Sequence, residues 1–132
     1  MIINNTPLRT SKNYKINNIE LDIDMPKEIE EFNNLTITGE TDKFKISSNV
    51  SKEPLTYGNS KELEEQVYKK GNQNLKIEDL KSGTLNLEFN FNEEDENLIE
   101  NIDIIANTKS KTTIIIKYLS EQDKAFYHNG II

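Results

Sequence analysis

The single histidine is the side chain best suited to acid–base chemistry in this sequence. His128 stands in the tetrapeptide Tyr-His-Asn-Gly near the C-terminus, and an imidazole changes its charge near neutral pH. Nucleophilic catalysis also needs a hydroxyl, thiol or amine within hydrogen-bond reach of the imidazole. No serine, threonine, cysteine or lysine adjoins His128 in the sequence, although a partner from elsewhere in the fold stays open. We interpret His128 as a surface or hydrogen-bonding residue, because one residue does not make a site.

Two groups of carboxylates have the chemistry of metal ligands or proton donors. The run Glu93 to Glu96 lacks both the spacing and the glycine of a calcium loop, so we interpret it as a solvated turn. Asp22 and Asp24 alternate with apolar residues and would share one face of a strand. Catalytic carboxylate pairs usually face each other from separate elements. This pair is therefore interpreted as a polar outer face.

The other signatures of catalysis are missing from the sequence. The chain has no cysteine, which excludes disulfides and thiolate ligands or nucleophiles. It contains no phosphate-binding glycine loop, zinc-ligand spacing or nucleophile elbow. Tyr57 and Tyr127 stand beside predicted turns, as aromatic residues of sugar-binding modules do, but there is no tryptophan. We predict no catalytic, cofactor-binding or metal-binding residue, and no enzyme.

The overall composition narrows the class of protein. The chain has 132 residues, a length that is enough for one domain with a modest core. Its formal net charge is −7. An acidic chain without a basic stripe is poorly suited to nucleic acid. The longest apolar run, Ile114 to Ile116, is too short to cross a membrane, and no segment resembles a signal peptide. We expect a cytoplasmic protein.

Apolar periodicity predicts a mainly β fold of the α+β type with one helix. Alternation predicts short strands at residues 19–24, 35–37 and 44–46, the last two around a turn at Gly39. The residues at 84–91 alternate most cleanly and predict a strand with one buried face. The β-branched segments at 98–106 and 112–119 predict strands buried on both sides.

One helix is predicted after a loop at residues 48–60. Asn59 is a suitable N-cap, and Leu63 and Val67 are four residues apart and share a face. Gly71 is a suitable residue just beyond the C-terminal end. Near the C-terminus, the dipeptide Asn-Gly at 129–130 predicts a tight turn, after which a new strand would begin.

Both ends of the chain resemble one protein family. The last third reads LIENIDIIANTKSKTTIIIKYLSEQDKAFYHNGII, which is similar to the opening of the core domain in the SufB/SufD family of iron–sulfur cluster assembly proteins. There a hydrophobic strand, a small-residue turn, a second strand, a polar loop and an aromatic-His-Asn-Gly turn follow one another. The matching segments are Ile104–Ala106, Ser110–Thr112, Ile115–Tyr118 and Tyr127–Gly130. The N-terminal TPLRT resembles the Pro-x-Arg-Thr opening, slightly favouring the SufD type, with Tyr14 where tryptophan is common.

The resemblance implies a fold and a function. Residues 1–95 would form an N-terminal α+β region, and residues 96–132 the truncated start of a right-handed parallel β-helix. The whole protein would be a scaffold that pairs with a SufB/SufD-type subunit and a SufC-type ATPase, and the iron–sulfur cluster would belong to the full-length assembly. The chain would be an N-terminal fragment, inactive alone, that self-associates through its last strands, because an uncovered coil exposes strand edges. The alternative is a complete small β-rich binding module, of the cell-surface or carbohydrate-binding type, without catalysis.

Overall fold

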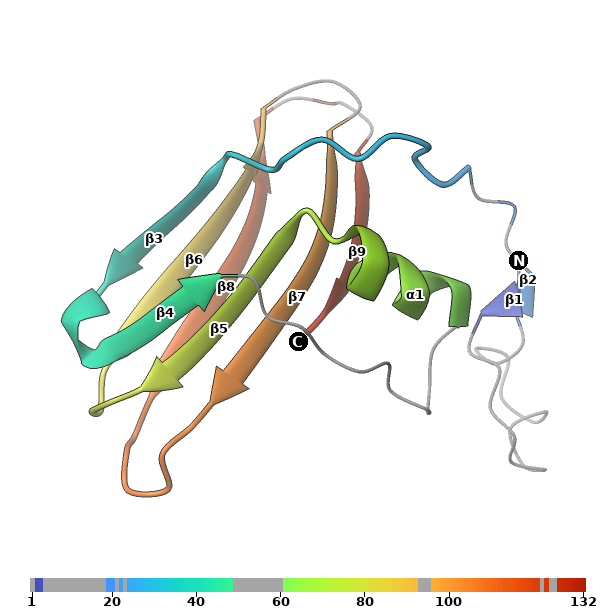
Figure 1. The fold of residues 1–132 in the computed structure, drawn as a ribbon. Coiled ribbons are helices and arrows are strands. Elements are labelled where there is room, and N and C mark those ends of the chain that lie inside the picture. Colours follow the sequence, from blue (N-terminus) through green and yellow to red (C-terminus); the bar gives the residue numbers. More distant parts are fainter. Residues whose placement is uncertain are drawn as a thin grey trace.

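The computed structural model is built on two β-sheets that face each other, with one α-helix (Figure 1). It describes residues 2–3, 19–20, 22, 24–48, 61–92, 96–121, 123 and 126–132. The elements are β1 (Ile2–Ile3), β2 (Ile19–Glu20), β3 (Leu35–Gly39), the 3₁₀ turn η2 (Thr41–Lys43), β4 (Phe44–Ser48), α1 (Lys61–Lys70), β5 (Gln73–Asp79), β6 (Thr84–Phe91), β7 (Asn97–Ile105), β8 (Thr113–Ser120) and β9 (Tyr127–Ile131). The prediction of a mainly β chain with one helix is confirmed.

The strands are arranged so that the chain passes repeatedly from one sheet to the other. One sheet has the order β3-β6-β8 and the other β4-β5-β7-β9, while β1 and β2 pair separately. From β5 onward, consecutive strands alternate between the two sheets, and β5/β7, β7/β9 and β6/β8 pair in parallel. Only β3/β6 and β4/β5 pair antiparallel within these sheets. Both sheets contain strands from before and after residue 95. The division into an N-terminal region of residues 1–95 and a core region of residues 96–132 stays a prediction.

The core lies between the two sheets. Along β6, Leu85, Leu87, Phe89 and Phe91 are almost completely buried and alternate with partly exposed polar residues, as the predicted strand at 84–91 requires. Leu98 and Ile102 of β7 belong to the same core. Each such side chain contributes about 1.5–3 kcal/mol by leaving water. Period-two alternation therefore places one face of each sheet in a shared apolar layer.

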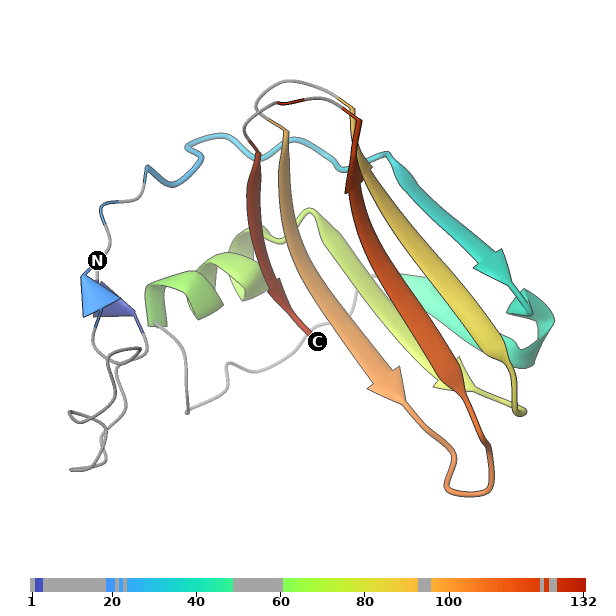
Figure 2. The same ribbon diagram turned by 180° about the vertical axis from the view of Figure 1, so that it is seen from behind.

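The strands β7 and β8 differ in burial, although similar burial was predicted for both. The first half of β7 is buried on both faces, because α1 packs against β7 and β9 on the side away from the core. The prediction for β8 is wrong: Ile115 and Leu119 are 39% and 41% exposed. Figure 2 shows the reason, since no described helix lies over the outer face of the sheet that contains β8.

The predicted helix is confirmed, and its C-terminal end is fixed to β7. Val67 is 1% exposed, whereas the predicted cap Asn59 lies outside the described residues. A side chain at Gly71 would place its Cβ 2.6 Å from the carbonyl oxygen of Val67, so the tight exit from the helix requires glycine. The next residue, Asn72, exchanges hydrogen bonds with Ile99: its main-chain N–H donates to the Ile99 carbonyl and its Oδ1 accepts from the Ile99 N–H.

The N-terminal predictions are corrected in part. The strand predicted at 19–24 is confirmed only at β2, whose two residues pair with the two residues of β1. Strands are present at β3 and β4, but these two strands do not pair with each other, because they belong to different sheets. Gly39 has a φ of 99°, a left-handed conformation that glycine adopts without a steric penalty, and the chain changes sheets just after it.

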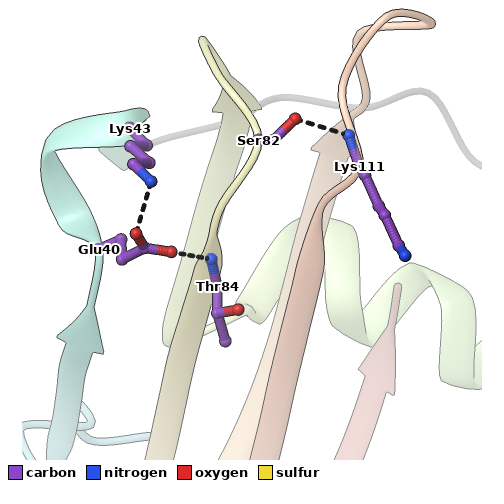
Figure 3. Close-up of polar contacts among 5 residues, drawn as sticks. All are labelled: Glu40, Lys43, Ser82, Thr84 and Lys111. Carbon is purple, nitrogen blue, oxygen red and sulfur yellow. Dashed lines mark hydrogen bonds and ion pairs between the residues drawn. The ribbon is translucent and has the colours of Figure 1, made fainter.

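Short polar contacts hold the corner at which β3 turns into β4 (Figure 3). Glu40 accepts hydrogen bonds from the Lys43 ammonium and from the main-chain N–H of Thr84 at 2.9 Å. Both hydrogen bonds lower the pKa of the Glu40 carboxyl, and the bond from Lys43 has the larger effect. The hydrogen bond between Lys43 and Glu40 in turn raises the pKa of the Lys43 ammonium. Nearby, the Lys111 N–H donates to the Ser82 hydroxyl at 2.9 Å. The corner is thereby joined to β6, and the turn before β6 to the connection that leads into β8.

Candidate functional site

The candidate site is a carboxylate buried between the two sheets. Glu100 lies on β7 and is 1% exposed, and its side chain points to the core side together with Leu98 and Ile102. A carboxylate leaves water at a large cost unless hydrogen bonds replace the water. Here Oε1 accepts a hydrogen bond from the Tyr118 hydroxyl and lies 2.9 Å from the His128 Nε2. Oε2 is buried without a hydrogen-bond partner among the described residues.

The two partners of Glu100 come from the last two strands. Tyr118 lies on β8 and His128 on β9, and their ring centroids are 4.4 Å apart. On its other side, Tyr118 stacks on Phe89 of β6 at 5.3 Å. Burial is the main cause that raises the pKa of the Tyr118 hydroxyl. The hydrogen bond to Glu100 and the negative charge of Glu100 raise this pKa further. The phenol therefore keeps its proton and acts as a donor, not as a nucleophile.

The neighbours of His128 within β9 bind the helix instead. The Tyr127 hydroxyl donates to Oε1 of Gln66 at 2.9 Å, and burial raises the pKa of this hydroxyl. The Asn129 amide donates to the same oxygen at 2.9 Å and to the Leu63 carbonyl at 3.0 Å. Because side chains alternate along a strand, β9 presents one pair of residues to α1 and the other pair to the space between the sheets.

The tight turn predicted at Asn129-Gly130 is wrong, since both residues belong to β9. Gly130 pairs with Glu100 in the register of β7 and β9. A Cβ at this position would lie 2.6 Å from Cγ and 2.7 Å from Oε1 of Glu100. Glycine is thus required by the close approach of a buried side chain, not by a turn. An isolated glycine within a strand pattern is the sequence signal for such an approach.

The chemistry of this arrangement is that of a structural network. A carboxylate that bonds an imidazole also occurs in catalytic triads, where a third group is the nucleophile. The contacts found for His128 are with the Glu100 carboxylate and the Tyr118 ring, and the raised pKa of Tyr118 opposes nucleophilic attack. The interpretation of His128 as a hydrogen-bonding residue is confirmed. The network connects three strands around one carboxylate.

The other predicted candidates lie apart from this network. Asp22 and Asp24 are exposed and outside any strand. Their expected place on a strand face is therefore wrong, because β2 ends at Glu20, while their expected exposure is confirmed. Tyr57 and the run Glu93 to Asp95 lie outside the described residues.

Glu96 and Glu100 show what sequence reasoning detected and what it missed. Glu96 was predicted to lie in a solvated turn, and it accepts hydrogen bonds from the Asn92 N–H at 2.9 Å and the Asn34 amide at 3.2 Å. Glu100 was not singled out. The only sequence feature that could have pointed to Glu100 is its position. It lies midway between Leu98 and Ile102, on the face of the strand whose side chains are buried.

Within the described ranges, no three His, Cys, Asp or Glu side chains gather as metal ligands would. Among the same described residues, no helix has the length and apolar character needed to cross a membrane. Comparison of the chain with protein-family models, with curated proteins and with solved structures finds no match.

Proposed function

We propose that the chain is the N-terminal part of a SufB/SufD-type scaffold subunit for iron–sulfur cluster assembly. The observation that carries this proposal is the alternation of β5 to β9 between two sheets, with parallel pairing of strands two apart in the chain. A parallel β-helix grows in this manner, because each coil places its strands beside those of the preceding coil. The proposed fold is therefore the beginning of a right-handed parallel β-helix.

The strand registers support such coils. Strands β6 and β8 pair without a break from Thr84↔Thr113 to Phe91↔Ser120. Inward-facing residues of similar kind fall beside each other, as Leu87 does with Ile116 and Phe89 with Tyr118. Stacked rows of like side chains let successive coils share one continuous core.

The segment Tyr127–Gly130, which contributes to the family resemblance, also supports a scaffold role. Tyr127 and Asn129 bind α1, while His128 and Gly130 accommodate Glu100. All four residues thus have structural partners within the chain. A segment used in this way fits a scaffold better than an active site.

The proposal extends to partners and location. The partner would be a SufB/SufD-type subunit, a SufC-type ATPase would dock on the assembly, and the protein would be cytoplasmic. The cluster is the cargo of the full-length assembly. Because the chain has no cysteine and its described residues form no ligand cluster, we assign no residue of this chain to cluster binding or catalysis.

The alternative, a small β-rich binding module, gains no specific support. Its argument used aromatic residues on loops, but Tyr127 lies in β9 and its hydroxyl is bonded to Gln66. It remains the second hypothesis for the pull-down below.

A pull-down with paired baits tests the proposal. The complete gene product and the 132-residue chain are each used to capture proteins from the source cell. Capture of the ATPase and the partner subunit by the complete product alone would support the scaffold. Capture by neither bait would contradict it and favour the binding module. Capture by both would support the scaffold but place a docking surface within these 132 residues.

A further inference from the structure

The strand β9 contains an Asn-Gly pair whose chemistry the proposed function does not use. Asn129 and Gly130 are neighbours in this strand, and no other asparagine of the 132-residue chain precedes a glycine. Asn-Gly is especially prone to deamidation. Glycine has no side chain to shield its own nitrogen, and it leaves the backbone free to rotate. The surrounding structure therefore decides whether this pair reacts.

Deamidation at this pair is an intramolecular substitution followed by hydrolysis. The main-chain nitrogen of Gly130 attacks Cγ of Asn129, so that a bond from nitrogen to Cγ forms while the bond from Cγ to Nδ2 breaks. Nδ2 leaves as ammonia and carries away the proton that the Gly130 nitrogen gives up. Water then opens the cyclic imide at either of the two bonds between its nitrogen and a carbonyl carbon, which yields aspartate or isoaspartate. Water is the only co-reactant, and nothing is oxidised or reduced.

The fold holds Asn129 in an arrangement that opposes the attack. Its Nδ2, the leaving group, donates to the Leu63 carbonyl at 3.0 Å and to Oε1 of Gln66 at 2.9 Å. Both acceptors belong to α1, which packs against β9 (Figure 1). Ring closure also requires the Cα–C bond of Asn129 to rotate out of the extended conformation of a strand. That rotation would direct the rest of β9 away from its pairing with β7, so the docked strand suppresses the reaction.

The product does not fit the place that the asparagine occupies. A carboxylate has no proton to donate, so the Leu63 carbonyl and Oε1 of Gln66 would each face another acceptor. Glu62 and Glu64 already stand in the first turn of α1, and they repel a new negative charge. Isoaspartate in addition lengthens the main chain by one atom, which disturbs the alternation of β9 against β7. Either product therefore weakens the contact between β9 and α1.

We propose that Asn129-Gly130 is a self-modification site, which deamidates when α1 releases the Asn129 amide and whose product hinders the helix from docking again. The rate follows the population of the released state. A transient separation of α1 from β9 is thereby converted into a lasting one. The inference rests on the contacts of Asn129 and is independent of the proposed function.

The rate of deamidation tests whether α1 controls the reaction. Peptide mapping by mass spectrometry follows Asn129 in the complete gene product near neutral pH. The synthetic peptide FYHNGII, residues 126–132, gives the rate without the fold. We expect the folded protein to react at least about tenfold more slowly than the peptide. Gln66→Ala removes one of the two acceptors and should accelerate deamidation of the folded protein at least about twofold, as the loss of a hydrogen bond predicts.

The substitution Ile46→Val is the matched control. Ile46 packs against the core from β4, at the opposite edge of the sheet from β9, so its truncation lowers stability without touching α1. Urea unfolding first verifies that both variants are folded. The control should deamidate at the wild-type rate within about twofold. A folded wild type that reacts as fast as the peptide, or a Gln66→Ala variant that reacts no faster than the control, would overturn the proposal.

The substitution Asn129→Asp tests the effect of the product. Hydrogen exchange followed by mass spectrometry reports how often the main-chain N–H groups of α1 open. We expect these groups to exchange at least about tenfold faster than in the wild type, because both hydrogen bonds from Asn129 to the helix are lost. Asn33→Asp, at an exposed amide, is the control and should leave the exchange of α1 unchanged. Wild-type exchange of α1 in Asn129→Asp, or the same acceleration in Asn33→Asp, would refute the claim that deamidation hinders docking.

Discussion

The substitution Gly130→Ala is predicted to destabilise the protein through contact with one buried side chain. The new Cβ would lie 2.6 Å from Cγ of Glu100, where carbon atoms normally keep about 3.5–4.0 Å apart. Glu100 is held by Tyr118 and His128 and cannot turn away without losing both bonds. Inserting an atom into a filled core costs about 1–3 kcal/mol. Alanine regains about 0.4–1 kcal/mol by restricting the unfolded chain. The expected net loss of unfolding free energy is about 1–2 kcal/mol.

Urea unfolding followed by circular dichroism measures this loss. For a small domain, the expected change lowers the urea midpoint by roughly 0.5–1 M with an unchanged slope. Gly83→Ala is the matched control. Its Cβ would lie 2.7 Å from Cδ of Lys43, which belongs to a flexible, partly exposed side chain that can move aside. The control should therefore change the unfolding free energy by less than about 0.5 kcal/mol.

A double-mutant cycle then identifies the cause. In a Glu100→Ala background the obstructing atoms are absent, so the cost of Gly130→Ala should shrink by at least about 1 kcal/mol. The reasoning would be refuted if Gly130→Ala behaved like the Gly83→Ala control, or if its cost were the same with and without the Glu100 side chain.

Three further predictions address the hydrogen bonds around this site. The raised pKa of Tyr118 means that the folded state keeps a proton that the unfolded state releases above about pH 10. Stability is therefore complete below that pH and falls above it, and Tyr118→Phe should flatten this fall in urea midpoints measured up to pH 11. Tyr127→Phe removes the hydroxyl bond to α1 and should cost about 0.5–1.5 kcal/mol in the same assay, whereas an unchanged midpoint would contradict that bond. Asn72→Ala leaves the buried-strand N–H of Ile99 without its acceptor and should cost about 1–3 kcal/mol in urea, while Asn33→Ala, at an exposed amide, should be neutral.

Elements with a strong local period could be predicted from the sequence. The alternation at 84–91 sets which side chains of β6 face the core. In α1 the spacing of Leu63 and Val67 was only a partial guide, because Val67 is buried but Leu63 is half-buried, and Glu64 and Gln66 are buried as well. These patterns depend on neighbours within one element. The exposure of β8 could not be found in this way, because it depends on whether a helix covers that sheet.

The candidate site depends on which strands become neighbours, which no local pattern shows. Glu100 resembles any glutamate in a strand until β8 and β9 bring Tyr118 and His128 to it. The prediction of a tight turn at Asn-Gly 129–130 was wrong for a related reason. Its turn propensity is a local preference, whereas the contacts with α1 and Glu100 that place it in β9 are tertiary.

The shared acceptor on the helix makes α1 and β9 one cooperative unit. Oε1 of Gln66 accepts hydrogen bonds from both Tyr127 and Asn129, so the helix cannot leave the sheet without breaking the side-chain hydrogen bonds that β9 makes outside its pairing with β7. Segments joined in this manner open and close together as a single local unfolding event. A ligand or a crowding surface that slows the opening of the helix would thereby also slow the fraying of β9, at the far end of the sequence from its point of contact.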